Sequence, residues 1–142
     1  YALSKSFFFQ TIFSWSLGKD VSIKYLRLPH VFGEGELKTR LWPQIKENKL
    51  KKIVINNPNF MTNFINIKKL TKKLNNYIDF KNIKKNFFEI KNVLDKDMSL
   101  YNFAIKEKKS LNSKVKIIKS TDRKNLWKFL IPKNDKFLIK IK

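Results

Sequence analysis

Apolar residues recur along this chain at two spacings, one typical of helices and one typical of strands. Helical spacing predicts helices over residues 2–17, 37–48, 67–78 and about 99–109. Alternating or short β-rich runs predict strands over residues 21–28, 53–55, 60–65, 86–93 and 115–118, and two more runs, 127–131 and 137–141, either pair as a terminal hairpin or are loosely attached. Strands separated by helices of this length favour an α/β fold built on a parallel sheet. The chain shows no internal repeat and no linker.

The first helical segment carries a pair of side chains with chemical potential. Tyr1 and Lys5 are four residues apart, so they share one face of the helix with Phe8 and Ile12, and we expect the pair to point inward. An ammonium at this spacing stabilises a phenolate, which makes the phenol a usable acid or base near neutral pH. Gly18 supplies a stop for this helix.

The charge of the chain allows two interpretations. It has 32 Lys and Arg against 11 Asp and Glu, for a net charge of +21 and a pI near 10.2. Such a balance is typical of a small RNA-binding protein of ribosomal type. Only three of the basic residues are arginines, however, and the abundant Lys, Asn, Ile and Phe have A/T-rich codons. A low-GC genome would produce the same charge with no anionic partner, and both interpretations stay open.

Other features of the composition restrict the possible chemistry. The chain has no cysteine and one histidine, which excludes disulfides, thiolate nucleophiles and the usual Cys or His metal sites, so no metal is expected. The apolar stretch 7–17 is too short to span a bilayer. At 142 residues, with 42% hydrophobic residues, the chain forms one domain or part of one. We expect a cytoplasmic protein with no membrane partner.

Four segments occur in an order that resembles one known family. They are Tyr1-Ala2-Leu3-Ser4-Lys5; Leu26-Arg27-Leu28-Pro29-His30-Val31-Phe32-Gly33-Glu34-Gly35; the run from Met61 to Leu70; and Phe88 to Ile105 with Ser99-Leu100-Tyr101-Asn102-Phe103. Together they resemble the C-terminal half of an extended short-chain dehydrogenase/reductase, in the NAD(P)-dependent epimerase/dehydratase group that acts on nucleotide-activated sugars. The resemblance covers about residues 1–110. It implies the C-terminal portion of a Rossmann-like parallel-sheet domain together with the small substrate-binding subdomain.

The resemblance also implies roles for individual residues. Tyr1 would be the catalytic acid/base, and Lys5 would stabilise the phenolate and bind the nicotinamide ribose of NAD or NADP, so both are catalytic and cofactor-binding residues. Pro29 and Val31 would lie beside the nicotinamide at the carboxyl end of a parallel strand.

Three further residues are assigned to the substrate, a nucleotide-activated sugar. His30 stands where the family usually has Asn, and Arg40 follows the same loop at the start of the next helix. An exposed loop histidine and an exposed surface arginine are the alternatives for these two residues. Thr62 stands where the family has a phosphate-binding arginine. The sugar, the choice between NAD and NADP, and the outcome among epimerisation, dehydration and reduction are open.

The resemblance divides the single segment 1–142 into three parts. Residues 1–35 end the Rossmann-like core, residues 36–110 form the substrate-binding region and late core elements, and residues 111–142 are a C-terminal extension. Because the family's glycine-rich turn and its catalytic Ser or Thr lie upstream of its Tyr, we expect the chain to be the downstream part of a larger protein, inactive alone. The helix carrying Tyr1 allows a homodimer. A catalytically dead relative of the family is the alternative.

Overall fold

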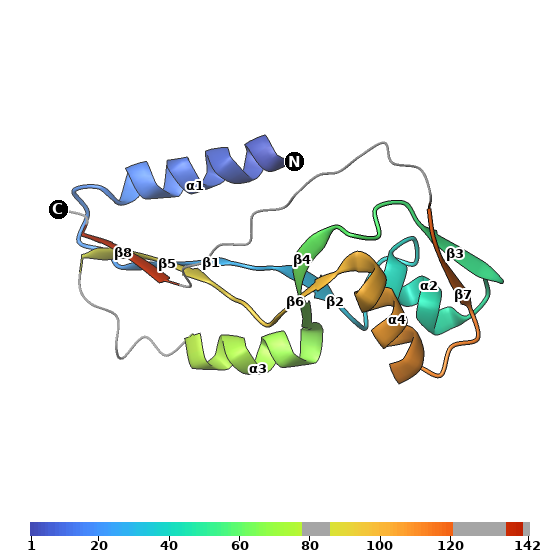
Figure 1. Cartoon of the computed structure of the whole chain (residues 1–142). Helices are drawn as coiled ribbons and strands as arrows, with labels where there is room; N and C mark the ends of the chain where they lie inside the picture. The colour runs from blue at the N-terminus through green and yellow to red at the C-terminus, as the bar shows by residue number, and fades with distance from the viewer. Residues whose placement is uncertain (78–85, 121–135, 141–142) are drawn as a thin grey trace.

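The computed structural model describes residues 1–77, 86–120 and 136–140, which form four helices and eight strands (Figure 1). The helices are α1 (Ala2–Ser16), α2 (Leu41–Glu47), α3 (Ile67–Tyr77) and α4 (Leu100–Ser110). The strands are β1 (Ile23–Arg27), β2 (His30–Phe32), β3 (Lys52–Ile55), β4 (Met61–Asn66), β5 (Phe87–Asn92), β6 (Lys96–Ser99), β7 (Lys116–Lys119) and β8 (Lys136–Lys140). The predicted α/β class is confirmed, and the parallel strands with their helices are consistent with part of a Rossmann-like domain.

The strands form three small sheets, each built around one parallel pair. Their orders are β1-β5-β8, β2-β4-β6 and β3-β7. The pairs β1–β5, β2–β4 and β3–β7 are parallel, whereas β8 and β6 add antiparallel edges. The first two sheets are therefore mixed where the sequence predicted parallel ones, and the third is purely parallel. Because β1 runs directly into β2 through Leu28 and Pro29, the first two sheets follow one another along the chain.

Helices cover both faces of the first sheet. In Figure 1, α1 lies along one side of β1, β5 and β8, and α3 lies on the other side. Neighbouring residues of β1 point to opposite faces, so Tyr25 packs in the cluster beneath α1, and Leu26 packs in the cluster with Leu70 of α3. The early strand β1 and the late strand β5 thus belong to the same sheet.

The second and third sheets share an aromatic and aliphatic core with α2 and α4. Phe64 of β4 and Phe103 of α4 stack with ring centroids 4.0 Å apart. Trp42 of α2 packs in the same cluster, and its indole N–H donates to the Glu107 carboxylate at 3.2 Å. The helix α4 begins where the sequence predicts, because the Ser99 hydroxyl accepts the Asn102 N–H at 3.1 Å as an N-cap.

Several sequence-based boundaries differ from the structure. The predicted loop 29–35 contains β2, and the polar segment before α4 contains β6, whose partner β4 selects the extended conformation. The segment predicted at 137–141 is β8, which pairs with β5, so it is part of the sheet and is not loosely attached. Its proposed hairpin partner, 127–131, lies outside the described residues.

Candidate active site

The Tyr1–Lys5 pair lies at the exposed first turn of α1. The Lys5 ammonium nitrogen is 5.3 Å from the centroid of the Tyr1 ring, as expected for side chains four residues apart. Tyr1 is 96% exposed. The expectation that the pair points inward is therefore wrong for Tyr1, and also for Phe8, which is 55% exposed. Of the residues expected on the inner face, Ile12 does pack inward, together with Phe9 and Phe13.

Contact with the first sheet determines which face of α1 packs inward. Phe9, Ile12 and Phe13 pack on Phe88 and Ile90 of β5. The rings of Phe9 and Phe13 meet the ring of Phe88 edge-on, at centroid distances of 5.7 and 5.2 Å. These contacts set the rotation of α1, which leaves its first turn beyond the aromatic cluster.

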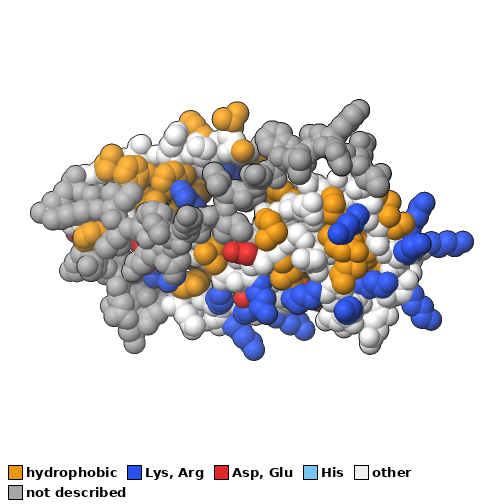
Figure 2. Space-filling view, viewed as in Figure 1, with side chains coloured by type: hydrophobic (Ala, Val, Ile, Leu, Met, Phe, Trp, Pro, Cys, Tyr) orange, Lys and Arg blue, Asp and Glu red, His pale blue; other side chains and the backbone are white. Residues whose placement is uncertain are grey.

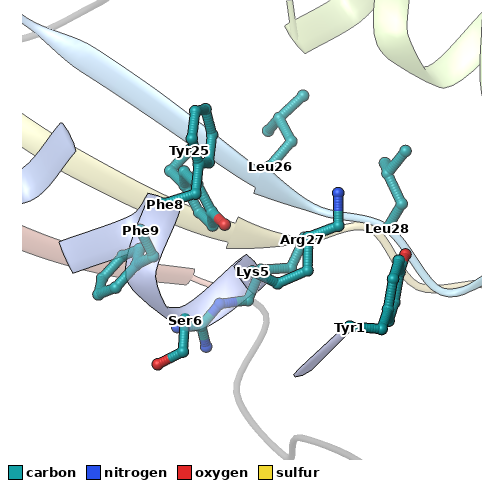
Figure 3. A pocket seen from close by; sticks show the side chains of 9 residues that line it. All are labelled: Tyr1, Lys5, Ser6, Phe8, Phe9, Tyr25, Leu26, Arg27 and Leu28. Carbon is teal, nitrogen blue, oxygen red and sulfur yellow. The ribbon is translucent and has the colours of Figure 1, made fainter. Parts of the chain in front are cut away.

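An open cavity of about 680 Å³ joins the first turn of α1 to the carboxyl end of β1 (Figure 3). Tyr1 and Lys5 line it from the helix, and Arg27 and Leu28 line it from the end of the strand. The Arg27 guanidinium carbon lies 5.4 Å from the centroid of the Phe9 ring. A phenol, an ammonium and a guanidinium therefore share one cavity at the position where parallel α/β sheets bind ligands.

A second cavity, of about 420 Å³, lies beyond β2. His30 and Arg40, both predicted from the sequence, line it together with Thr39, Leu41, Gln44, Ile53, Val54, Ile55, Asn56, Asn57, Leu100 and Phe103. Its polar groups are an imidazole, a guanidinium, a hydroxyl and three amides, which are donors suited to an anionic, hydrogen-bonding ligand. His30 is only two residues beyond Leu28 of the first cavity.

The remaining predicted site residues lie outside both linings. Val31 packs in the core cluster with Ile65 and Leu70. Pro29 connects the two strands, and Thr62 lies on β4 opposite Met98. The backbone role predicted for Pro29 and Val31, and the substrate role of Thr62, stay predictions.

Glu36, which was not predicted from the sequence, lies next to His30. Its carboxylate oxygen Oε1 is 3.8 Å from His30 Nε2. Burial raises the pKa of Glu36, against smaller opposing effects of a Gly33 backbone hydrogen bond and the Arg40 charge. Burial also lowers the pKa of His30, and the charge of Arg40 lowers it further. The Gly33-x-Gly35 turn was the available signal, since it folds the chain back toward His30.

The raised pKa of Glu36 predicts a pH-dependent effect of Glu36→Gln on stability. The unfolded chain releases this proton near the ordinary value of 4.5, before the folded chain does. Wild-type protein therefore loses stability, relative to the uncharged variant, as the pH rises from 4.5 through the raised pKa. Urea unfolding at about pH 4 and about pH 7 should show a variant-minus-wild-type difference that increases with pH. A constant or decreasing difference would contradict this assignment.

Gly33 is required where it stands for two reasons. Its φ of 131° is a conformation that other residues rarely adopt, and an added Cβ would lie 2.8 Å from Ile67 Cγ2. We expect Gly33→Ala to lower the free energy of unfolding by about 1–3 kcal/mol. Gly35→Ala is the control, because Gly35 also has positive φ but has open space at the Cβ position. Equal losses in the two variants, measured by denaturant unfolding, would show that the contact with Ile67 contributes nothing.

Basic side chains spread over much of the surface. Figure 2 shows Lys and Arg along the lower edge below α3 and at the end of the molecule that carries β3 and β7. Several lysines are close to acids: Lys24 lies 3.7 Å from Glu89, and Lys49 lies 3.3 Å from Glu47. This distribution does not distinguish an RNA-binding surface from a charge produced by A/T-rich codons, and RNA binding stays a prediction.

Metal-binding clusters and membrane-spanning helices are both absent from the described part of the chain. Residues 1–77, 86–120 and 136–140 contain no cluster of three or more His, Cys, Asp or Glu side chains arranged to hold a metal ion. Within the same residues, no helix has the length and apolar character needed to cross a membrane.

Comparisons with known proteins give little further information. No protein-family model and no curated protein matches the chain. A solved structure described as the X-ray structure of Pen from Bacillus thuringiensis is similar, with 18% sequence identity and a TM-score of 0.46. The match covers 84% of this chain and 40% of that chain, so these 142 residues span less than half the length of that protein. A likeness this weak carries no argument about activity.

Proposed function

We propose that these residues are the substrate-side part of an NAD(P)-dependent epimerase, dehydratase or reductase acting on a nucleotide-activated sugar. The observation that carries the proposal is the cavity shared by Tyr1, Lys5 and the carboxyl end of β1. It combines an acid/base pair with the strand terminus at which α/β proteins bind dinucleotides. A cytoplasmic location belongs to the same proposal.

The side chains of this cavity fit the nicotinamide end of the cofactor. Its volume of about 680 Å³ is within the range of cofactor sites, and its phenol, ammonium and guanidinium suit ribose hydroxyls and an anionic dinucleotide. Tyr1 and Lys5 would hold the nicotinamide ribose, and the bound group would supply hydride transfer. Gly33 and Gly35 flank a turn and do not form a phosphate-binding glycine loop, so the fit concerns the nicotinamide end alone.

Within this proposal, Tyr1 transfers a proton and Lys5 assists the transfer. Tyr1 would accept a proton from a sugar hydroxyl, or return one to a keto oxygen, through its phenolic oxygen. Lys5 would stabilise the phenolate, since its ammonium already lies over the Tyr1 ring. Because Tyr1 is 96% exposed, water must be excluded from the first turn of α1 for this charge interaction to be strong.

The second cavity is proposed to bind the anionic part of the substrate. Arg40 brings a guanidinium to a cavity that also holds the His30 imidazole and the amides of Gln44, Asn56 and Asn57. Guanidinium groups bind phosphate through paired hydrogen bonds. Thr62 stands where the family has a phosphate-binding arginine, and Arg40 is proposed to bind the substrate phosphate in its place.

A homodimer through α1 is part of the same proposal. The outer face of this helix exposes large apolar side chains, which a solvated helix seldom carries in such number. They are Leu3, Phe7, Phe8 and Trp15.

The direct test is an activity assay on the natural full-length protein that carries this sequence. It should be incubated with NAD or NADP and each of a panel of UDP-, dTDP- and GDP-sugars, with products followed by NMR. We expect cofactor-dependent conversion of one sugar class, and Arg40→Gln should raise KM about tenfold, the value of one charged hydrogen bond. Lys38→Gln is the control, because Lys38 is exposed and lines neither cavity. Absence of conversion with every donor and both cofactors would refute the proposal.

A further inference from the structure

The turn after β2 brings a buried carboxylate to the only histidine of the chain. β2 ends at Phe32, and the Glu36 N–H then donates to the Gly33 carbonyl at 3.3 Å, which closes a four-residue turn. This turn returns the chain toward the start of β2. Glu36 Oε1 consequently lies 3.8 Å from His30 Nε2, within range of a strong charge interaction but beyond hydrogen-bond distance.

Glu36 has one carboxylate oxygen without a hydrogen-bond partner among the described residues. Its side chain is 14% exposed, and its Oε2 is fully enclosed with no hydrogen-bond partner among the described residues. A buried carboxylate with an unused acceptor costs stability unless a donor approaches it. The His30 ring approaches the other oxygen, Oε1, and a backbone hydrogen bond with Gly33 also acts on the carboxyl group.

The His30 ring is held on its other side by aromatic packing. Its centroid lies 5.1 Å from that of Phe64, with the rings inclined by 63°. Phe64 is fixed in turn by its stack on Phe103. The ring therefore contacts Phe64 and lies near the Glu36 carboxylate, and it lines the second cavity.

Burial brings the proton affinities of His30 and Glu36 closer together, whereas the charge of Arg40 lowers the pKa of both groups. Arg40 acts on both groups, and Glu34 of the same turn is taken up in an ion pair with Lys46. Burial shifts the pKa of His30 down and the pKa of Glu36 up, so the two affinities for a proton approach each other.

We propose that Glu36 is the positioning residue of His30, sharing one proton with the imidazole and so fixing the ring at the mouth of the second cavity. When the pair takes up a proton from solvent, the gap between Nε2 and Oε1 closes to a charge-assisted hydrogen bond. The opposite ring nitrogen is then directed toward a ligand by the same contact. A catalytic role for the positioned His30 ring rests on the proposed function. The coupling between the protonation of Glu36 and that of His30 does not.

The proposal is tested by NMR titration of the single histidine. In wild-type protein, the His30 ring signals should show a second, smaller step at acidic pH where Glu36 titrates. In Glu36→Gln, that step should vanish and the pKa of His30 should fall further, because the attracting negative charge is gone. Glu34→Gln is the matched control, an acid of the same turn that is ion-paired with Lys46, and it should leave the His30 titration unchanged.

Two results would overturn the proposal. One is a single-step His30 titration in wild-type protein, which needs no variant to fold. The other is a Glu36→Gln titration that matches Glu34→Gln.

Adding UDP as a probe separates this inference from the proposed function. Binding that raises the pKa of His30 in wild-type protein, and raises it less in Glu36→Gln, supports the coupling through linkage. If UDP does not bind, the substrate proposal for this cavity fails, while the titration of the free protein still decides whether Glu36 holds His30.

Discussion

Replacing Tyr1 with Phe should, under the proposed function, lower kcat of the natural full-length protein by about 10²–10⁴-fold, the usual contribution of one acid/base group. The substitution removes a single oxygen from an exposed side chain, so neither the core nor the helix changes. KM should stay within about twofold, because an interaction made only in the transition state affects kcat and not ground-state binding. Steady-state kinetics with the sugar identified by the activity assay provides the measurement.

Tyr77→Phe is the matched control for Tyr1→Phe. Tyr77 also begins a Tyr-x-x-x-Lys sequence, which shows that the motif alone is not specific. It lies at the end of α3, packs in the core cluster with Leu70, and has the Lys91 ammonium 4.5 Å from its ring centroid. We expect kcat of the Tyr77→Phe variant to equal that of the wild type. Equal losses of kcat in Tyr1→Phe and Tyr77→Phe would contradict a catalytic role for Tyr1.

Replacing Phe88 with Ala should lower the free energy of unfolding by about 3–5 kcal/mol. Phe88 is 0% exposed and is the ring on which Phe9 and Phe13 of α1 converge. Its removal leaves a cavity between α1 and the sheet, and aromatic contacts are lost in addition to buried area. Because those contacts set the rotation of α1, the variant should also disturb the position of the Tyr1–Lys5 pair.

Phe7→Ala is the control for this core substitution. Phe7 lies on the outer face of α1 and is 71% exposed, so at protein concentrations too low for the proposed dimer to form, its loss should change stability by less than about 0.5 kcal/mol. Urea unfolding of the three proteins under identical conditions makes the comparison. A Phe88→Ala loss no larger than that of Phe7→Ala would mean that α1 does not pack on the sheet as described.

The elements predicted most accurately are those in which the spacing of apolar residues matches the face that is buried. The segment Ile67, Leu70 and Leu74 has one apolar face, and α3 turns that face to the sheet as expected. The strand β5 and the cap at Ser99 were likewise predicted within a residue, since alternation and capping are local signals.

The rotation of α1 was not predictable by the same means. The helix is apolar around most of its circumference, so its period gives no preferred face, and the face that packs is decided by contact with Phe88. Strand β6 was missed for a related reason. Its residues Lys96 and Asp97 are polar, and their extended conformation comes from pairing with β4.

The candidate site was predicted in part. His30 and Arg40 were both named from the sequence, and the fold brings them to one cavity. Glu36 was not named, because its approach to His30 depends on a turn with two glycines at positive φ. Spacing along the chain gives no direct signal for such a contact.

The most direct measurement of the central claim is NADH binding by the natural full-length protein, with Lys5→Met compared with Lys19→Met. Lys19 follows the far end of α1 and lines neither cavity. The account predicts enhanced NADH fluorescence on binding, an affinity about tenfold or more weaker in Lys5→Met, and an unchanged affinity in Lys19→Met. No binding by the wild type, or equal affinities in the two variants, would contradict the placement of a nicotinamide cofactor at the Tyr1–Lys5 cavity.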